Sequence, residues 1–242
     1  MRILSGSGTI APRVRPYNRR VIYFPLALPV LLLLGLLLVL LVVLIELKVL
    51  AYAYRKIGVR PRYVFAVMVL TLLGSHVNIP VYSMPAQRFV RQPAPGSYGW
   101  RYAPPRIVRT GRTVVAVNVG GALIPGLISL YLFIRMRMYG RMLVATAVVA
   151  LVVHQLAHIV PGAGIAVPMF IPPLLAAGVA LLLAFRRAPP VAYVAGSMGT
   201  LIGADLLNLT RLAEIGAPVV SIGGAGTFDG VFLTGIIAGL LA

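Results

Sequence analysis

The feature that most constrains this chain is a long apolar run near its N-terminus, from Val21 to Leu44, which contains no charged residue. A bilayer core about 30 Å thick is crossed by about 20 apolar residues in a helix, so this run predicts a membrane span. Its helix can continue through Glu46 and Lys48 to Tyr54. The run is too long for the apolar core of a signal peptide, and no small-residue cleavage site follows it. We therefore expect a retained anchor.

Six further apolar segments each predict a membrane span. Of the 242 residues, 60% are hydrophobic and only 11% are charged, which is not the composition of a soluble globular domain. The fold class we predict is all-α, a polytopic transmembrane bundle of about seven spans. A basic N-terminal tail (1–20) precedes one transmembrane domain (21–242), which has a basic surface loop at 85–112. The six further segments are Tyr63–Met84, Thr113–Ile134, Met142–Val160, Ile165–Phe185, Pro190–Thr210 and Ala217–Ala242.

The end of the basic loop has two interpretations. Residues 106–109 and 112–115 flank a Thr-Gly turn and are rich in β-branched residues, which predicts a short two-stranded ribbon. An irregular proline-rich loop fits the same residues equally well.

The charge is one-sided, with 22 Lys and Arg against 4 Asp and Glu and a formal net charge of +18. Arginines at both ends of most spans predict contact with anionic lipid headgroups. We expect no nucleic-acid partner, because the basic residues punctuate apolar spans and form no separate domain. Similar numbers of basic residues on the two sides give no orientation by the positive-inside rule. The chain has no cysteine, which excludes disulfides and thiolate metal sites.

Asp205 is an ionisable group at membrane depth, where such groups are costly and usually face a bundle interior or a cavity. Small residues at 196, 199 and 203 share a face of the predicted span and predict close helix contact. Asn208, three residues after Asp205, can point into the same crevice. The competing interpretation places Asp205 near the interface, bonded to a neighbour.

Asp229 follows a run with glycines at 223, 224 and 226, where a continuous helix is disfavoured. The last span is therefore predicted to be broken there. If helix resumes with Thr227 as its N-cap, Asp229 lies in the first turn, near the positive end of the helix dipole. Gly226, Thr227 and Asp229 would then line a site at depth. The alternative is that Asp229 only caps a helix.

Other polar residues add candidates. His154 and His158 are four residues apart, which on a helix places them on one face, but Gln155 stands where a zinc hydrolase would carry a catalytic Glu. We predict no metal and no cofactor, although a metal held by the two histidines stays open. Asn118 and His154 are included as candidate binding residues, and packed hydrogen-bonded groups are the alternative for them and for His76.

Several blocks of this sequence resemble an uncharacterised family of prokaryotic integral membrane proteins, defined only as a domain of unknown function. The likeness spans roughly residues 60 to 242 and implies the prokaryotic cell membrane as the location. It implies no activity. The blocks are Asn78–Tyr82, Val117–Pro125, the turn from Pro161 to Pro168, Gly203–Asn208 and Gly223–Gly235.

A second pattern is similar to the GxGD-type intramembrane aspartyl proteases, the presenilin, signal peptide peptidase and prepilin peptidase group. One span carries Asp205, and Gly224-Ala225-Gly226 precedes the second aspartate, Asp229. The resemblance implies that these two residues form a catalytic pair. Thr227 and Phe228 separate Gly226 from Asp229, and Ala204 stands where presenilins have Tyr, so the pattern departs from that family.

Two functions therefore follow as hypotheses. As an enzyme, the protein would cleave transmembrane peptides with Asp205 and Asp229 sharing a proton. As a small transporter or channel, it would bind a proton or cation at the broken last helix, with Asn208, Asn118 and His154 contributing.

Overall fold

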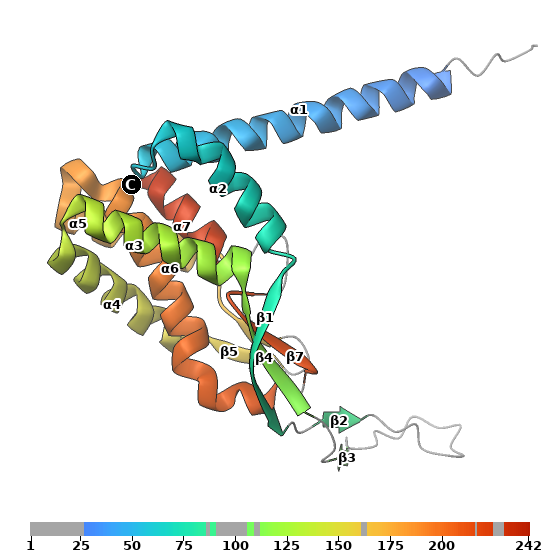
Figure 1. Cartoon of the computed structure of the whole chain (residues 1–242), viewed down its shortest axis with the longest axis vertical. Coiled ribbons are helices and arrows are strands. Elements are labelled where there is room, and N and C mark those ends of the chain that lie inside the picture. The colour runs from blue at the N-terminus through green and yellow to red at the C-terminus, as the bar shows by residue number, and fades with distance from the viewer. Residues whose placement is uncertain are drawn as a thin grey trace, which may run out of the picture. The chain divides into compact units, whose positions relative to one another are not determined.

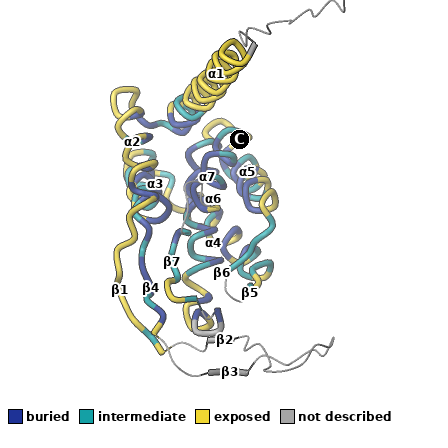
Figure 2. Tube along the Cα trace, turned by 90° about the vertical axis from the view of Figure 1, so that its right-hand side faces the viewer, coloured by how far each residue is buried: buried dark blue, intermediate teal, exposed yellow. Residues whose placement is uncertain are grey.

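The computed structural model describes residues 27–85, 88–90, 106–108, 112–160, 164–215, 217–224 and 230–242. The predicted basic tail (1–20) and most of the predicted surface loop (85–112) lie outside these residues. The chain divides into two compact units, Met1–Leu44 and Ile45–Ala242. In the first unit the described residues, 27–44, belong to helix α1 (Ala27–Lys56), and the leucines and valines of this part of the helix are exposed and yellow in Figure 2. An exposed apolar helix surface of this kind is suited to lipid contact.

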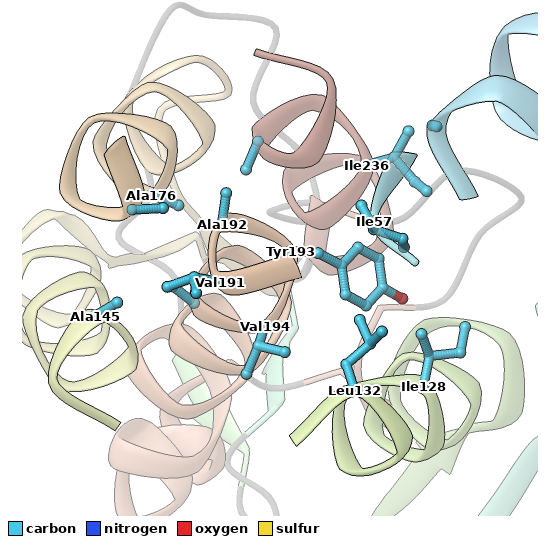
Figure 3. Packing of buried hydrophobic residues seen from close by; sticks show 14 of the residues in the cluster. Ile57, Ile128, Leu132, Ala145, Ala176, Val191, Ala192, Tyr193, Val194 and Ile236 are labelled. Atoms are coloured by element: carbon cyan, nitrogen blue, oxygen red, sulfur yellow. The ribbon is translucent and has the colours of Figure 1, made fainter. Parts of the chain in front are cut away.

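The second unit is mostly helical (Figure 1). After the end of α1 come α2 (Pro61–Gly74), α3 (Ile124–Met136), α4 (Tyr139–Leu156), α5 (Ile171–Ala184), α6 (Ala188–Thr200) and α7 (Gly230–Leu241). Helix α6 packs against α3, α4, α5 and α7 and is buried on nearly every side. Figure 3 shows the ring of Tyr193 on α6 among Ile57, Leu132 and Ile236. The core of this unit is therefore built around α6.

Small residues on α6 allow the close helix contacts that the sequence predicts, but on two faces. A Cβ atom at Gly196 would lie 3.1 Å from the backbone oxygen of Thr234 on α7. A Cβ atom at Gly199 would lie 2.6 Å from Val149 Cγ1 on α4. Positions 196 and 199 therefore face different helices, since three residues are less than a full helical turn.

Strands replace helix in the second, third and last predicted spans. Strand β1 (Asn78–Pro85) pairs antiparallel with β4 (Arg112–Asn118), and β4 pairs in parallel with β7 (Val219–Ile222), which gives the sheet order β1-β4-β7. In the second predicted span, helix α2 ends at Gly74, and Pro80, which cannot donate to a helix, lies in β1. The prediction of continuous helices over 63–84 and 113–134 is therefore wrong.

The ribbon predicted from residues 106–109 and 112–115 is also wrong in its pairing. Strand β3 (Arg106–Val108) pairs with β2 (Arg88–Val90), whereas β4 pairs with β1 and β7. Both β-branched segments do form strands, but these two strands pair with other strands and not with each other. The second two-stranded sheet pairs β5 (His158–Val160) antiparallel with β6 (Gly164–Ala166), so strand also takes the end of the predicted span 142–160 and the start of the predicted span 165–185.

Among the described residues, four helical stretches are long and apolar enough to cross a membrane, which supports a membrane protein but does not confirm seven spans. They are Leu28–Lys56, Val119–Met136, Tyr139–Leu156 and Ile171–Leu212. The last of these includes both α5 and α6, joined by the short turn η2 (Phe185–Arg187). Helices α2 and α7 are apolar but shorter. The last predicted span is not a continuous helix, because its first part is strand β7.

Candidate functional site

Asp205 lies where helix α6 changes its winding. After Thr200 the chain forms a π-helix, η3 (Leu201–Asp205), and then a 3-10 helix, η4 (Leu206–Glu214). Gly203 in η3 packs directly on α4, where an added Cβ atom would lie 2.4 Å from the backbone oxygen of Ala150. Short π-helical segments are frequent at functional sites, because they displace side chains from the regular helical register. Asp205 is the last residue of this segment.

A backbone N–H group anchors the Asp205 carboxylate. Gly223 N donates to Asp205 Oδ2 over 2.7 Å. Gly223 follows strand β7 and has a backbone φ of +82°, which residues other than glycine rarely adopt. A Cβ atom at Gly223 would also lie 2.6 Å from Ala122 Cβ. The turn after β7 therefore needs glycine both for its backbone and for its close approach to η1 (Val119–Leu123).

A cavity of about 370 Å³ lies beside this carboxylate. Its walls come from α6 and η3, from η4, from β6 and the residues after it, and from β7, and Gly230 at the start of α7 also lines it. Most of the described lining residues are apolar, and Asp205 carries the only charge among them. Thr200 also lines the cavity, and its buried Oγ1 has no hydrogen-bond partner within the described residues. The cavity thus has one carboxylate in its lining, and the unpaired hydroxyl group of Thr200 is buried in its wall.

Asn118 does not line this cavity, although it was predicted as a binding residue. It is 1% exposed, and its side chain joins three segments. Nδ2 donates to Ser75 O over 2.7 Å and to Asn78 Oδ1 over 3.1 Å, while Oδ1 accepts from Gly121 N over 2.7 Å. The contacts of Asn118 are those of a packed, hydrogen-bonded group that caps η1 and ties β4 to the end of α2.

Strand β7 connects the Asn118 cluster to the cavity. Ser221 on β7 lines the cavity, and its Oγ donates to Asn78 Oδ1 over 2.6 Å. Asn78 Oδ1 therefore accepts from both Ser221 and Asn118. Gly223, which anchors Asp205, is two residues further along the chain. Asp205 is thus linked to the residue after β7 through Gly223, and Asn118 is linked to β7 through Asn78 and Ser221.

Asn208 and His154 form a second polar contact away from the cavity lining. Asn208 is 2% exposed, and its Nδ2 donates to the backbone oxygens of Gly203 and Ala204 over 3.2 and 3.0 Å. The same nitrogen lies 3.3 Å from His154 Nδ1 on α4. Irregular helices leave carbonyl groups without their usual partners, and Asn208 satisfies two of them. Asn208 therefore bonds to the helix backbone beside Asp205 and does not line the Asp205 cavity.

The two histidines do not share a helical face. Helix α4 ends at Leu156, so His158 lies in β5, and its Nδ1 is 3.3 Å from Leu156 O. In the part of the chain that the structure describes, no group of three His, Asp or Glu side chains is close enough to hold a metal ion. His76 contacts Ser75 Oγ and Leu72 O near the end of α2.

Three predicted site residues, Gly226, Thr227 and Asp229, lie outside the described residues. Residues that the sequence interpretation did not select include Thr200, Ser221 and Asn78. The signal that could have found them is proximity in sequence to residues already selected. Thr200 is close to Asp205, Ser221 is close to the glycine run, and Asn78 begins the block Asn78–Tyr82. Their roles depend on contacts between segments far apart in the chain.

Comparison with protein families gives one result for this chain. The sequence model of a family described as "Protein of unknown function (DUF1614)" matches residues 72–241. Searches of curated proteins and of solved structures gave no match. The matched region contains the sheet, the cavity and every described candidate residue. Because the match covers well over half of the sequence, the chain belongs to this family of unknown function.

Proposed function

We propose that this membrane protein binds a small monovalent cation beside Asp205 and conducts or transports it. The observation that carries the proposal is the Asp205 carboxylate, which accepts from Gly223 N on one oxygen and lines a largely apolar cavity. The unpaired hydroxyl of Thr200 is buried in the wall of the same cavity. A carboxylate at membrane depth is costly, so its presence favours a role in binding.

The size and charge of the cavity favour one positive charge. A volume of about 370 Å³ is near the lower end of ordinary ligand pockets and far exceeds that of a single water molecule. One carboxylate balances a monovalent ion with part of its water, or a protonated amine with a small apolar body. Divalent ions usually require several oxygen ligands of higher total charge.

The interrupted helix is a second support. Carriers often bind ions where a membrane helix is broken, because the break frees backbone groups at depth. Asp205 lies at the change from π-helix to 3-10 helix within the candidate span Ile171–Leu212. The turn at Gly223 adds a second irregular segment on the other side of the carboxylate.

The test is cation flux into liposomes that contain the purified full chain, with Na⁺, K⁺ and methylammonium as probes. We expect Asp205→Asn to reduce flux to the level of empty liposomes. Thr200→Val keeps the size but removes one hydroxyl, which should weaken binding by roughly twofold to tenfold. Glu46→Gln is the matched control, because Glu46 is an exposed acidic residue on α1 and should leave flux unchanged. Flux that persists in Asp205→Asn would contradict the proposal.

A second candidate function, intramembrane proteolysis by Asp205 and Asp229, has two observations in its favour. Gly230, the residue after Asp229, lines the same cavity as Asp205. Strand β7, which also lines the cavity, is an edge strand of its sheet among the described elements, and edge strands can pair with an extended peptide. A peptide substrate paired with β7 would have its backbone next to Asp205 and Asp229, which would act as the acid and base pair.

The same preparations separate the two functions. A protease requires both carboxylates, so Asp205→Asn and Asp229→Asn should each abolish cleavage of a fluorogenic transmembrane peptide. Transport at the Asp205 cavity predicts no cleavage by the wild-type protein and loss of flux in Asp205→Asn. Wild-type behaviour of both variants in both assays would exclude a functional role for these carboxylates.

A further inference from the structure

A second surface, distinct from the Asp205 cavity, is a groove between two helix turns. The α3–α4 turn contributes Arg135, Arg137 and Arg141, and the α5–α6 turn contributes Arg186 and Arg187. The groove is open and has a volume of about 1100 Å³. All five arginines are exposed. We call this surface the arginine groove.

The positive charge of the arginine groove is not balanced by nearby acids. None of its described lining residues is Asp or Glu. Arg135 is held in place, since its Nη1 donates to Gly58 O and to the hydroxyl of Tyr131. For Arg137, Arg141, Arg186 and Arg187 the described residues provide no hydrogen bond or ion pair. Four guanidinium groups are therefore available to an anion.

The position of the arginine groove matches the headgroup level of a membrane. The candidate span Val119–Met136 ends at this groove and the next one, Tyr139–Leu156, begins there. Phe185 and Tyr139 also line it and are 79% and 45% exposed. Aromatic rings and arginines together are typical of a membrane interface, where one part of a ligand is charged and the other is apolar. A free phosphate ion would use the arginines but not these rings.

We propose that the arginine groove binds the phosphate groups of an anionic phospholipid. Guanidinium groups bind phosphate oxygens in pairs, and two turns with at least two arginines each can hold a headgroup with more than one phosphate. Basic pockets between membrane helices are known to suit such lipids. The exposed aromatic side chains contact the adjoining glycerol and acyl region. This binding does not depend on the function of Asp205.

The test is native mass spectrometry of the purified full chain with added cardiolipin, phosphatidylglycerol or phosphatidylcholine. We expect the wild-type protein to retain cardiolipin in preference to phosphatidylcholine. One basic residue at an anionic surface contributes roughly fivefold in affinity, so Arg137→Gln, Arg141→Gln and Arg187→Gln combined should weaken retention on the order of 100-fold. Inorganic phosphate at millimolar concentration should not displace the lipid.

The control removes three arginines elsewhere, with Arg60→Gln, Arg62→Gln and Arg112→Gln combined. These residues are exposed and do not line the groove, so this variant has the same net charge as the test variant. Equal loss of lipid in the two variants would overturn the proposal in favour of general electrostatic attraction. Displacement by inorganic phosphate would overturn the assignment to a lipid. Unchanged circular dichroism spectra would show that both variants fold.

Discussion

Replacement of Asn118 gives the sharpest test of how the sheet and helices are joined. As a helix cap alone, Asn118 would need only an acceptor for Gly121 N, and Asp would serve equally well. In the structure the side chain also donates, to Ser75 O and to Asn78 Oδ1. Asn118→Asp keeps the acceptor but loses both donors, and it brings a carboxylate oxygen against the carbonyl of Ser75.

The magnitude follows from the groups left without partners. Asn118→Ala leaves Gly121 N–H and Ser75 O without their side-chain partner, whereas Asn78 Oδ1 keeps the hydroxyl of Ser221. A buried polar group that loses its partner costs about 1–3 kcal/mol, so we expect about 2–6 kcal/mol of destabilisation for two. Asn118→Asp should lose at least as much, because it adds repulsion between two oxygens that replace a 2.7 Å hydrogen bond.

The assay is unfolding of the purified protein in mixed micelles, followed by circular dichroism as the fraction of denaturing detergent rises. Ser83→Ala, an exposed change on the neighbouring strand β1, is the control and should stay within about 0.5 kcal/mol of the wild type. If Asn118→Asp is as stable as the wild type while Asn118→Ala is not, then the cap alone matters and the bridging role assigned to the Nδ2 group is refuted.

Two further predictions concern glycines. Gly203→Ala should destabilise the fold, because its Cβ would lie 2.4 Å from the backbone oxygen of Ala150, whereas Gly178→Ala on α5 meets no atom within 4 Å and should stabilise the helix by up to about 1 kcal/mol. Opposite shifts in thermal unfolding would agree with this packing, and equal shifts would contradict it. Gly223→Ala should cost more than 1 kcal/mol, since φ is +82° and Cβ would lie 2.6 Å from Ala122 Cβ. The same unfolding assay measures that loss, and a wild-type midpoint would show that the turn is not as tight as described.

The sequence by itself determined the apolar helices. Predicted spans at 142–160, 165–185 and 190–210 contain α4, α5 and α6, because a long apolar segment with few charges forms its hydrogen bonds internally, although β5 and β6 take the end of the first and the start of the second. The glycines at 196, 199 and 203 also indicated close packing before any partner helix was known. These features depend on local composition and spacing, which are visible in the sequence.

Only the tertiary structure decided where apolar chain becomes strand. Residues 112–118 and 219–222 are short and rich in β-branched residues, and such runs fit a buried helix or a strand equally well. The choice depends on pairing between β4 and β7, which lie about 100 residues apart in sequence. No local pattern contains that information, since the hydrogen-bond partners are supplied by a distant segment.

The candidate site shows the same division. Asp205 could be selected from the sequence because a carboxylate in an apolar segment is costly to bury in a membrane and is therefore rarely present without a role. Its anchor Gly223, the neighbouring hydroxyl of Thr200 and the cavity walls from β6 and β7 became known only from the fold. Asn118 and Asn208 were recognised from the sequence as polar residues in apolar segments, but in the fold their side chains bond to backbone groups and neither residue lines the cavity. A polar residue in an apolar segment can be identified from the sequence, whereas its hydrogen-bond partner depends on the geometry of the folded chain.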